Sequence, residues 1–102
     1  MGSRLTLDSE LRTILGSNNV YFQPPEGFKM HYPCIVYEKS RVNTRYADNR
    51  VYQGRNRYSV TVIDPDPDTE IPDKLLRHFM YCRSDRDFVS DTLHHYAFDL
   101  YY

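Results

Sequence analysis

The sequence predicts an α+β fold in which about two helices pack on one face of a mainly antiparallel sheet. Two segments repeat apolar residues at helical spacing, and several runs alternate β-branched or aromatic residues with polar ones. Helices are expected only at the start and between two runs of strands, which is typical of α+β proteins. The expected element order is α-β-β-β-α-β-β, in one domain over residues 1–102.

The first expected helix covers residues 5–15. Its apolar residues follow the i, i+4, i+7, i+8 spacing of an amphipathic helix: Leu7, Leu11, Ile14 and Leu15. Gly16 is expected to end this helix, because glycine readily adopts the left-handed conformation found after a helix C-terminus. Asp8 or Ser9 is the expected N-cap, since both side chains accept hydrogen bonds from backbone N–H groups.

Three extended segments are expected next. Residues 20–22 form a short strand or arm that Pro24 and Pro25 end, because each proline fixes its own φ and restricts the residue before it. Residues 32–44 and 55–63 are rich in β-branched and aromatic side chains, and we expect them to pair as an antiparallel hairpin. One face of the later strand is expected to carry Tyr58, Val60 and Val62.

The second helix is expected after a turn of sequence Asp-Pro-Asp-Pro-Asp-Thr-Glu at residues 64–70. The prolines of this segment exclude helix interior and central strand. Pro72 fits the first turn of the helix, and Asp68 or Thr69 is the expected cap. The expected apolar stripe consists of Ile71, Leu75, Leu76 and Phe79.

The remainder of the chain predicts two more strands. One is expected to begin at residues 80–82 and to continue towards residue 89, and the other covers residues 92–102. Alternation along the last strand places four residues on one face: Tyr96, Phe98, Leu100 and Tyr102.

The sequence offers no pattern typical of catalysis or of metal binding. His94 and His95 are adjacent on an expected strand, so their side chains point to opposite faces and do not chelate one ion side by side. The acidic run at 64–73 lacks the central glycine and the terminal glutamate of a calcium loop. Nucleophile-elbow and glycine-rich phosphate motifs are also missing from the sequence, so we expect no catalytic residue, no metal and no cofactor.

The two cysteines, Cys34 and Cys82, fit no metal or redox motif and are expected to be half-buried, reduced thiols. A disulfide between them stays open at this point. No apolar run approaches the ~20 residues that a membrane-spanning helix needs, and the first residues lack an apolar signal region. The chain is therefore expected to be soluble and not exported.

Charge is separated along the chain. The formal net charge is only -1, with 13 Lys and Arg against 14 Asp and Glu, which argues against a protein whose whole purpose is to neutralise phosphates. Five arginines nevertheless lie close together in the sequence: Arg41, Arg45, Arg50, Arg55 and Arg57. The acidic run that follows contains Asp64, Asp66, Asp68, Glu70 and Asp73.

Three interpretations of this charge separation remain open. The charges form solvated edges, or the basic segment of one copy contacts the acidic turn of the next, or the arginines contact DNA phosphates. The ten tyrosines are too many for a core of this size, so several are expected at the surface or at subunit interfaces, where Tyr and Arg are enriched. Alternatively, the tyrosines simply line the sheet faces.

Several segments resemble one family of phage proteins. They are Leu-Arg-Thr-Ile-Leu-Gly (11–16), Val-Tyr-Phe-Gln-Pro-Pro (20–25), Tyr-Pro-Cys-Ile-Val-Tyr (32–37), Tyr-Ser-Val-Thr-Val-Ile-Asp (58–64), Asp-Pro-Asp (66–68) and Ile-Pro-Asp-Lys-Leu (71–75). Together they make nearly the whole chain similar to the tail terminator, or tail-to-head joining, proteins of long-tailed (siphovirus-like) bacteriophages and prophages.

This resemblance implies a non-enzymatic structural virion protein that caps the completed tail tube and joins the tail to the head. It implies a ring of copies, hexameric in tail terminators, whose other partners are the tail tube protein and a neck or head-completion protein. The expected location is the tail–neck junction of the virion, after assembly in the bacterial cytoplasm and without membrane contact. The alternatives are a neck or head-completion protein of the same connector, and a small nucleic-acid-binding protein that uses an Arg-rich β-hairpin.

Residue roles follow from combining the charge pattern with the ring. Arg41 and Arg45 are assigned to the subunit interface, opposite the acidic turn of a neighbouring copy. The acidic members of that interface are Asp64, Asp66, Asp68 and Glu70. The channel or partner contacts, which include non-specific contact with DNA, are assigned to Arg50, Arg55 and Arg57.

Overall fold

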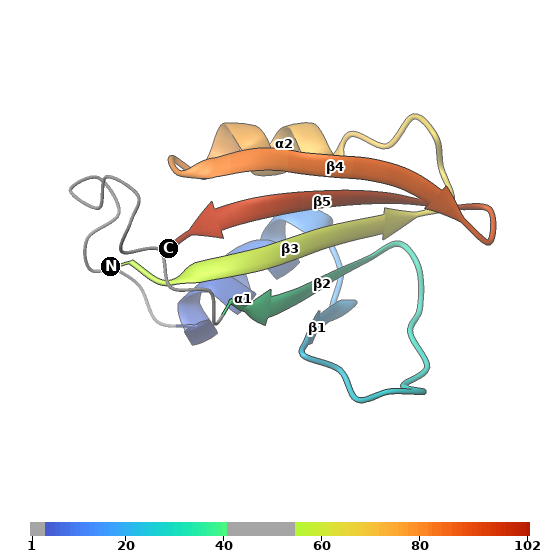
Figure 1. Cartoon of the computed structure of the whole chain (residues 1–102), viewed down its shortest axis with the longest axis horizontal. Coiled ribbons are helices and arrows are strands. Elements are labelled where there is room, and N and C mark those ends of the chain that lie inside the picture. The colour runs from blue at the N-terminus through green and yellow to red at the C-terminus, as the bar shows by residue number, and fades with distance from the viewer. Residues whose placement is uncertain (1–3, 41–54) are drawn as a thin grey trace.

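In the computed structural model of the chain, which describes residues 4–40 and 55–102, two helices pack against one five-stranded sheet (Figure 1). The elements in order are α1 (Arg4–Leu15), β1 (Val20–Phe22), β2 (Cys34–Lys39), β3 (Arg57–Asp64), α2 (Ile71–His78), β4 (Cys82–Ser90) and β5 (Leu93–Tyr101). The predicted α+β class and the predicted order α-β-β-β-α-β-β are therefore confirmed.

The strands are arranged in the order β1-β2-β3-β5-β4. β2 pairs antiparallel with β3, as predicted for the segments around residues 32–44 and 55–63. β5 pairs antiparallel with both β3 and β4. β1 is the exception, because it runs parallel to β2 with Val20 opposite Ile35. The sheet is thus mixed at one edge, where residues 23–33 carry the chain back along the strands.

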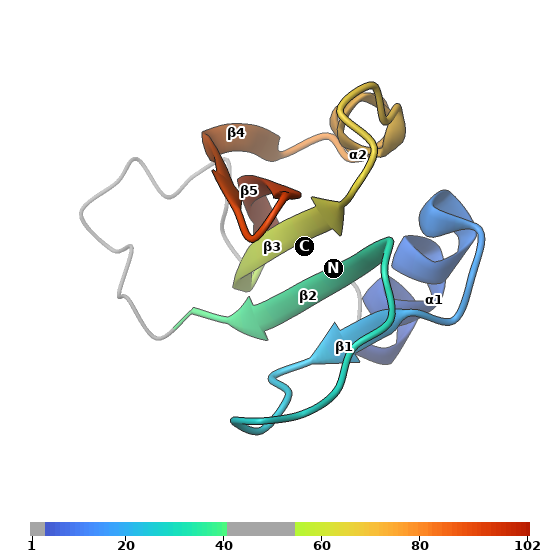
Figure 2. The same ribbon diagram turned by 90° about the vertical axis from the view of Figure 1, so that its right-hand side faces the viewer.

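Both helices cover the same face of the sheet, as Figure 2 shows by their position on one side of the strands. The residues packed between helices and sheet are Leu7, Leu11, Ile14, Val20, Ile35, Tyr37, Tyr58, Val60, Val62, Leu75, Phe79, Phe98 and Leu100. The alternation predicted for the later strand of the hairpin is confirmed, since all three of its inward residues are buried. Two tyrosines, Tyr37 and Tyr58, belong to this core, so part of the tyrosine content is structural.

Helix α1 begins before both residues that were expected to cap it. It starts at Arg4, so Asp8 and Ser9 lie inside the helix and the predicted N-cap is wrong. The predicted end is confirmed: Gly16 has φ of 81° and its N–H donates to the Arg12 carbonyl at 2.8 Å. Only glycine adopts this left-handed conformation without steric cost.

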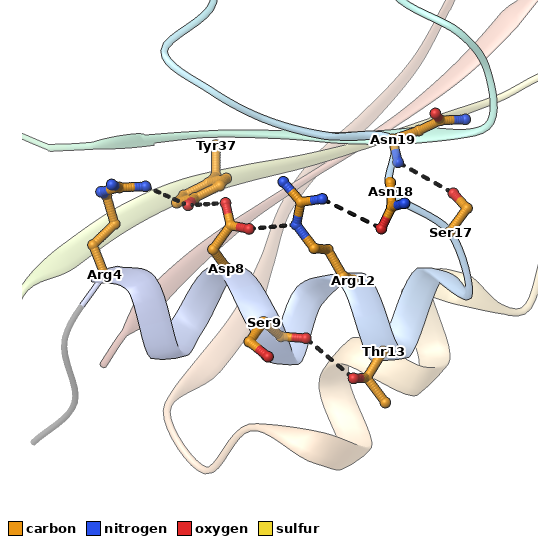
Figure 3. A network of polar contacts seen from close by, with 9 residues as sticks. All are labelled: Arg4, Asp8, Ser9, Arg12, Thr13, Ser17, Asn18, Asn19 and Tyr37. Carbon is orange, nitrogen blue, oxygen red and sulfur yellow. Dashed lines mark hydrogen bonds and ion pairs between the residues drawn. The ribbon is translucent and has the colours of Figure 1, made fainter.

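The Asp8 carboxylate instead links α1 to β2 (Figure 3). One oxygen accepts a 2.6 Å bond from Arg12 Nε and the other accepts a 2.6 Å bond from the Tyr37 hydroxyl. Burial alone would raise the pKa of Asp8, but the bonds from Tyr37 and Arg12 outweigh burial and lower it. The same burial and the bond to Asp8 raise the pKa of Tyr37 to about 12.

Helix α2 follows its prediction in part. Pro72 lies in the first turn, and Thr69 Oγ1 accepts a 3.3 Å bond from the Ile71 N–H. The N-cap position itself belongs to Glu70 rather than to Asp68 or Thr69, and the Glu70 side chain makes no capping bond with the described residues. Thr69, one residue before the N-cap, therefore supplies the side-chain acceptor for the first turn of the helix.

One member of the predicted apolar stripe of α2 is misplaced. Leu75 is fully buried and Phe79 is 8% exposed, whereas Leu76 is 40% exposed. Successive helical residues are about 100° apart, so a short helix that turns Leu75 towards the core turns Leu76 away from it. Neither described helix is long and apolar enough to cross a membrane.

The sheet order also answers the question of the cysteines. Cys34 lies on β2 and Cys82 on β4, with β3 and β5 between them. Three strand spacings amount to about 14 Å, twice the ~7 Å limit between the Cα atoms of a disulfide. Both thiols are accordingly free, and burial is the main cause that raises the pKa of Cys34 to about 12 and of Cys82 to about 11.

Candidate functional site

A cleft of about 420 Å³ opens where the ends of α2 and β5 meet α1; we call it the Tyr81 cleft. Its lining consists of Glu10, Arg55, His78, Phe79, Met80, Tyr81, Tyr101 and Tyr102. These residues come from four separate segments of the chain, so the cleft exists only in the folded protein. Tyr, Arg and Met are the residue types enriched in protein interfaces, whereas Lys and Ser are depleted there.

One wall of the cleft is held by a polar contact between three elements. Glu10 of α1 lies with one carboxylate oxygen 2.7 Å from His78 Nε2, at the end of α2. Its other oxygen accepts a hydrogen bond from the hydroxyl of Tyr102, the residue after β5. We call this contact the Glu10 clasp, since it ties both helices to the end of the last strand.

The clasp keeps Glu10 ionised. Burial by itself would raise the pKa of Glu10, but the bonds from Tyr102 and His78 outweigh that effect and lower the pKa. Burial and the bond to the Glu10 carboxylate raise the pKa of Tyr102 to about 12. The Glu10 carboxylate is therefore a charged acceptor, with one partner on each oxygen.

Aromatic rings form the rest of the cleft. The rings of His78 and Phe79 meet edge to face with centroids 4.7 Å apart, and Phe79 meets Tyr102 in the same way at 6.0 Å. The guanidinium of Arg55 lies over the Tyr81 ring, 4.6 Å from its centroid. Met80 projects at the rim with 82% of its surface exposed. The cleft thus combines a cation with several accessible aromatic surfaces.

The five sequence-predicted arginines do not form one site. Arg41, Arg45 and Arg50 lie outside the described residues. Arg55 lines the Tyr81 cleft. Arg57 pairs with Asp99 on the neighbouring strand at 3.0 Å, and only a quarter of its side chain is exposed.

The Arg57–Asp99 pair therefore lies on the face of the sheet that the helices leave uncovered. The Nε atom of Arg57 is buried and has no hydrogen-bond partner in the described part of the chain. Arg57 therefore belongs to a pair within the sheet, whereas Arg55 lies in the lining of the Tyr81 cleft.

The acidic turn lies at the opposite end of β3 from these two arginines (Figure 1). Its first carboxylate, Asp64, is buried and accepts the N–H of Asp66 at 2.8 Å. Asp66 in turn accepts the N–H of Asp68 at 2.9 Å. These side-chain bonds hold the backbone in two successive turns of the kind that Asp favours. Asp64 thus has a structural role, whereas Asp66, Asp68 and Glu70 are exposed.

The histidine pair also has separate environments. The His95 ring stacks on Phe88 at 4.6 Å with an angle of 12°, and its Nδ1 lies 3.1 Å from the Leu93 carbonyl oxygen. His94 lies opposite Asp64 in the β3–β5 ladder. Within residues 4–40 and 55–102, no group of three or more His, Cys, Asp or Glu side chains is arranged to hold a metal ion.

Most of the cleft was not identifiable in the sequence. Glu10 and His78 are separated by 68 residues, and Glu10 and Tyr102 by 92, so no local motif connects them. The general signal was the excess of tyrosines, three of which line the cleft. No family model, curated protein or solved structure matches this chain.

Proposed function

We propose that this protein is a structural component of a phage virion that caps the completed tail tube and joins the tail to the head as a ring of subunits. The support is the resemblance of its segments to tail terminators, together with the placement of its charges. The ring order expected from the resemblance is six, and the expected neighbours are the tail tube protein and a neck or head-completion protein. The proposed role needs no catalysis and no cofactor.

The observation that carries the proposal is the separation of two different surfaces by the length of β3. The strand has eight residues from Arg57 to Asp64, so its ends are about 23 Å apart at ~3.3 Å per residue. The acidic turn lies beyond one end, and Arg55 with the Tyr81 cleft lies beside the other.

Surfaces placed in this way favour a head-to-tail contact. A copy does not bring its own turn to its own cleft, but the turn of one copy reaches the cleft of the next. Such heterologous contacts close into rings when the rotation between copies allows. Opposite charges on the two surfaces would orient the copies during assembly.

Deletion of the gene from a phage or prophage that encodes this chain tests the proposal. We expect filled heads and unjoined tails of uncontrolled length in negative-stain images of the lysate. Purified protein added to isolated tail tubes should bind at one end of each tube. Tails of normal length in the deletion would contradict capping, and leaking heads beside normal tails would identify a neck or head-completion protein instead.

A further inference from the structure

We infer that the Tyr81 cleft of one copy receives the first part of the acidic turn of a second copy, residues 64–68. This inference rests on the proposed ring and names the surfaces that would join its subunits. It commits to a second copy of this chain as the occupant. The reasons are the shape and rigidity of the turn, the chemistry of the cleft and the charges on both.

The turn is exposed and already rigid. Four consecutive residues of it are exposed: Pro65, Asp66, Pro67 and Asp68. The prolines fix their own φ angles, and the bonds from Asp64 to the Asp66 N–H and from Asp66 to the Asp68 N–H fix the rest of the turn. A segment held in one conformation loses little entropy on binding, so most of its contact energy remains available for affinity.

The cleft has the chemistry that such a turn requires. Segments that contain proline bind well against aromatic side chains, because the preset proline backbone loses little entropy on binding and its apolar ring contacts the aromatic surface. Tyr81, Tyr101 and Tyr102 supply such surfaces. Arg55, stacked over Tyr81, supplies a positive charge beside them, and a guanidinium is suited to carboxylates such as Asp66 and Asp68.

Glu10 is the one carboxylate among the described residues that line the cleft. A bare carboxylate there would repel the turn. Each Glu10 oxygen already has a partner, Tyr102 on one and His78 on the other. Both oxygens of Glu10 are therefore already hydrogen-bonded within the same copy, and the positively charged Arg55 also lines the cleft.

Photo-crosslinking tests this contact. Met80, exposed at the rim of the cleft, is replaced by p-benzoylphenylalanine in the full chain, which is irradiated at high concentration and analysed by gel and mass spectrometry. We expect cross-links from position 80 to residues 65–68 of another copy. We also expect a ladder of products above the dimer, because every copy carries both surfaces. The same replacement at Phe28, which is also exposed and lies in the β1–β2 connection, should give no cross-link to the turn.

Charge exchange provides the second measurement. Arg55→Glu and Asp68→Lys, made singly, should each lower the yield of the cross-link about tenfold, because each places like charges across the contact. The combined variant Arg55→Glu/Asp68→Lys should recover most of the yield. Asp73→Lys, which changes an exposed carboxylate outside the turn, is the matched control and should leave the yield unchanged.

The inference is overturned if position 80 cross-links elsewhere or not at all, if the products stop at a dimer, or if the combined variant does not recover. Failure of the proposed function gives a different result. In that case the cross-link to the turn forms in the purified protein, whereas deletion of the gene leaves tail length normal.

Discussion

Two carboxylates of α1, Asp8 and Glu10, make the same kind of contact in two different surroundings. Each accepts a hydrogen bond from a tyrosine hydroxyl on one oxygen and is approached by a basic side chain on the other. Asp8 bonds to Tyr37, which is fully buried, and pairs with a permanent cation, Arg12. Glu10 bonds to the partly exposed Tyr102 and pairs with His78, which is charged only when protonated.

The comparison shows that the Asp8 contact stabilises the core, whereas the Glu10 clasp shapes the surface of the cleft. The Asp8 contact attaches the first helix to the second strand, and removing Asp8 leaves the hydroxyl of the buried Tyr37 without its acceptor. The Glu10 clasp lies at the wall of the Tyr81 cleft, where water replaces a lost partner more readily. A buried hydrogen bond with a charged partner contributes more than an exposed one, because its loss leaves an unsatisfied group away from water.

The largest expected effect is that of Asp8→Ala. It leaves the Tyr37 hydroxyl buried without its acceptor and removes two bonds to a charged group, so we expect the free energy of unfolding to fall by about 2 kcal/mol. Urea unfolding followed by circular dichroism measures the change. Ser9→Ala, the exposed neighbour on α1, is the control and should stay within about 0.5 kcal/mol.

Glu10→Gln should have about half that effect, near 1 kcal/mol, because the clasp is half-exposed and the amide keeps an acceptor oxygen. The same urea titration applies. A loss equal to that of Asp8→Ala would show that the two contacts are equivalent, and the distinction between core and surface would be wrong.

Acid should weaken both the Asp8 contact and the Glu10 clasp, because protonation of either carboxylate removes its stabilising charge. The pKa values of Asp8 and Glu10 are lowered in the folded state from ordinary values of 3.8 and 4.5. Their contribution is therefore fully present above those ordinary values and is lost as the pH falls through the lowered ones. Because most of that loss lies below about pH 4, the change between about pH 7 and pH 4 should be smaller than either substitution.

Urea midpoints measured from about pH 7 to pH 3 check this expectation. Asp8→Ala should show a shallower acid decline than the unmodified chain, since one of the two linked carboxylates is missing. If the urea midpoint of that variant falls with pH as steeply as that of the unmodified chain, Asp8 does not contribute to the acid dependence of stability.

Alkali should produce the smallest effect. The pKa values of Tyr37 and Tyr102 are raised to about 12 from an ordinary value of 10.0, so their neutral forms stabilise the folded state. That stabilisation is present below about pH 10 and is lost as the pH rises towards 12. Unfolding midpoints at pH 8 to 11 should decline less in Tyr102→Phe than in the unmodified chain. A tyrosine spectrum that titrates near pH 10 for every residue would contradict the prediction.

Local patterns were enough to predict most of the fold. The spacing of Leu7 and Leu11 predicted a helix, and the alternation of Val60 and Val62 predicted a half-buried strand; all four are core residues. These predictions succeeded because periodicity depends only on residues that are near in sequence. Leu76 failed because its burial depends on which side of a short helix faces the sheet, and that is a tertiary property.

The candidate site was much harder to predict. Arg55 was identified through charge clustering, but its neighbour Arg57 is paired with Asp99, a residue 42 positions away. The charge pattern assigns Asp64 to the interface, but its burial and its bond from the Asp66 N–H show that it shapes the turn. A sequence reports which residues are charged and not which charges are already satisfied.

The sequence by itself determined the order of the elements, the end of α1 at Gly16 and the rigid acidic turn, since each depends on the conformational preferences of neighbouring residues. Only the tertiary structure decided the parallel pairing of β1, the separation of the two cysteines and the formation of the Tyr81 cleft. The physical reason is that strand order and helix packing bring together residues that no local preference relates. Glu10, His78 and Tyr102 meet only because one core buries both helices against one sheet.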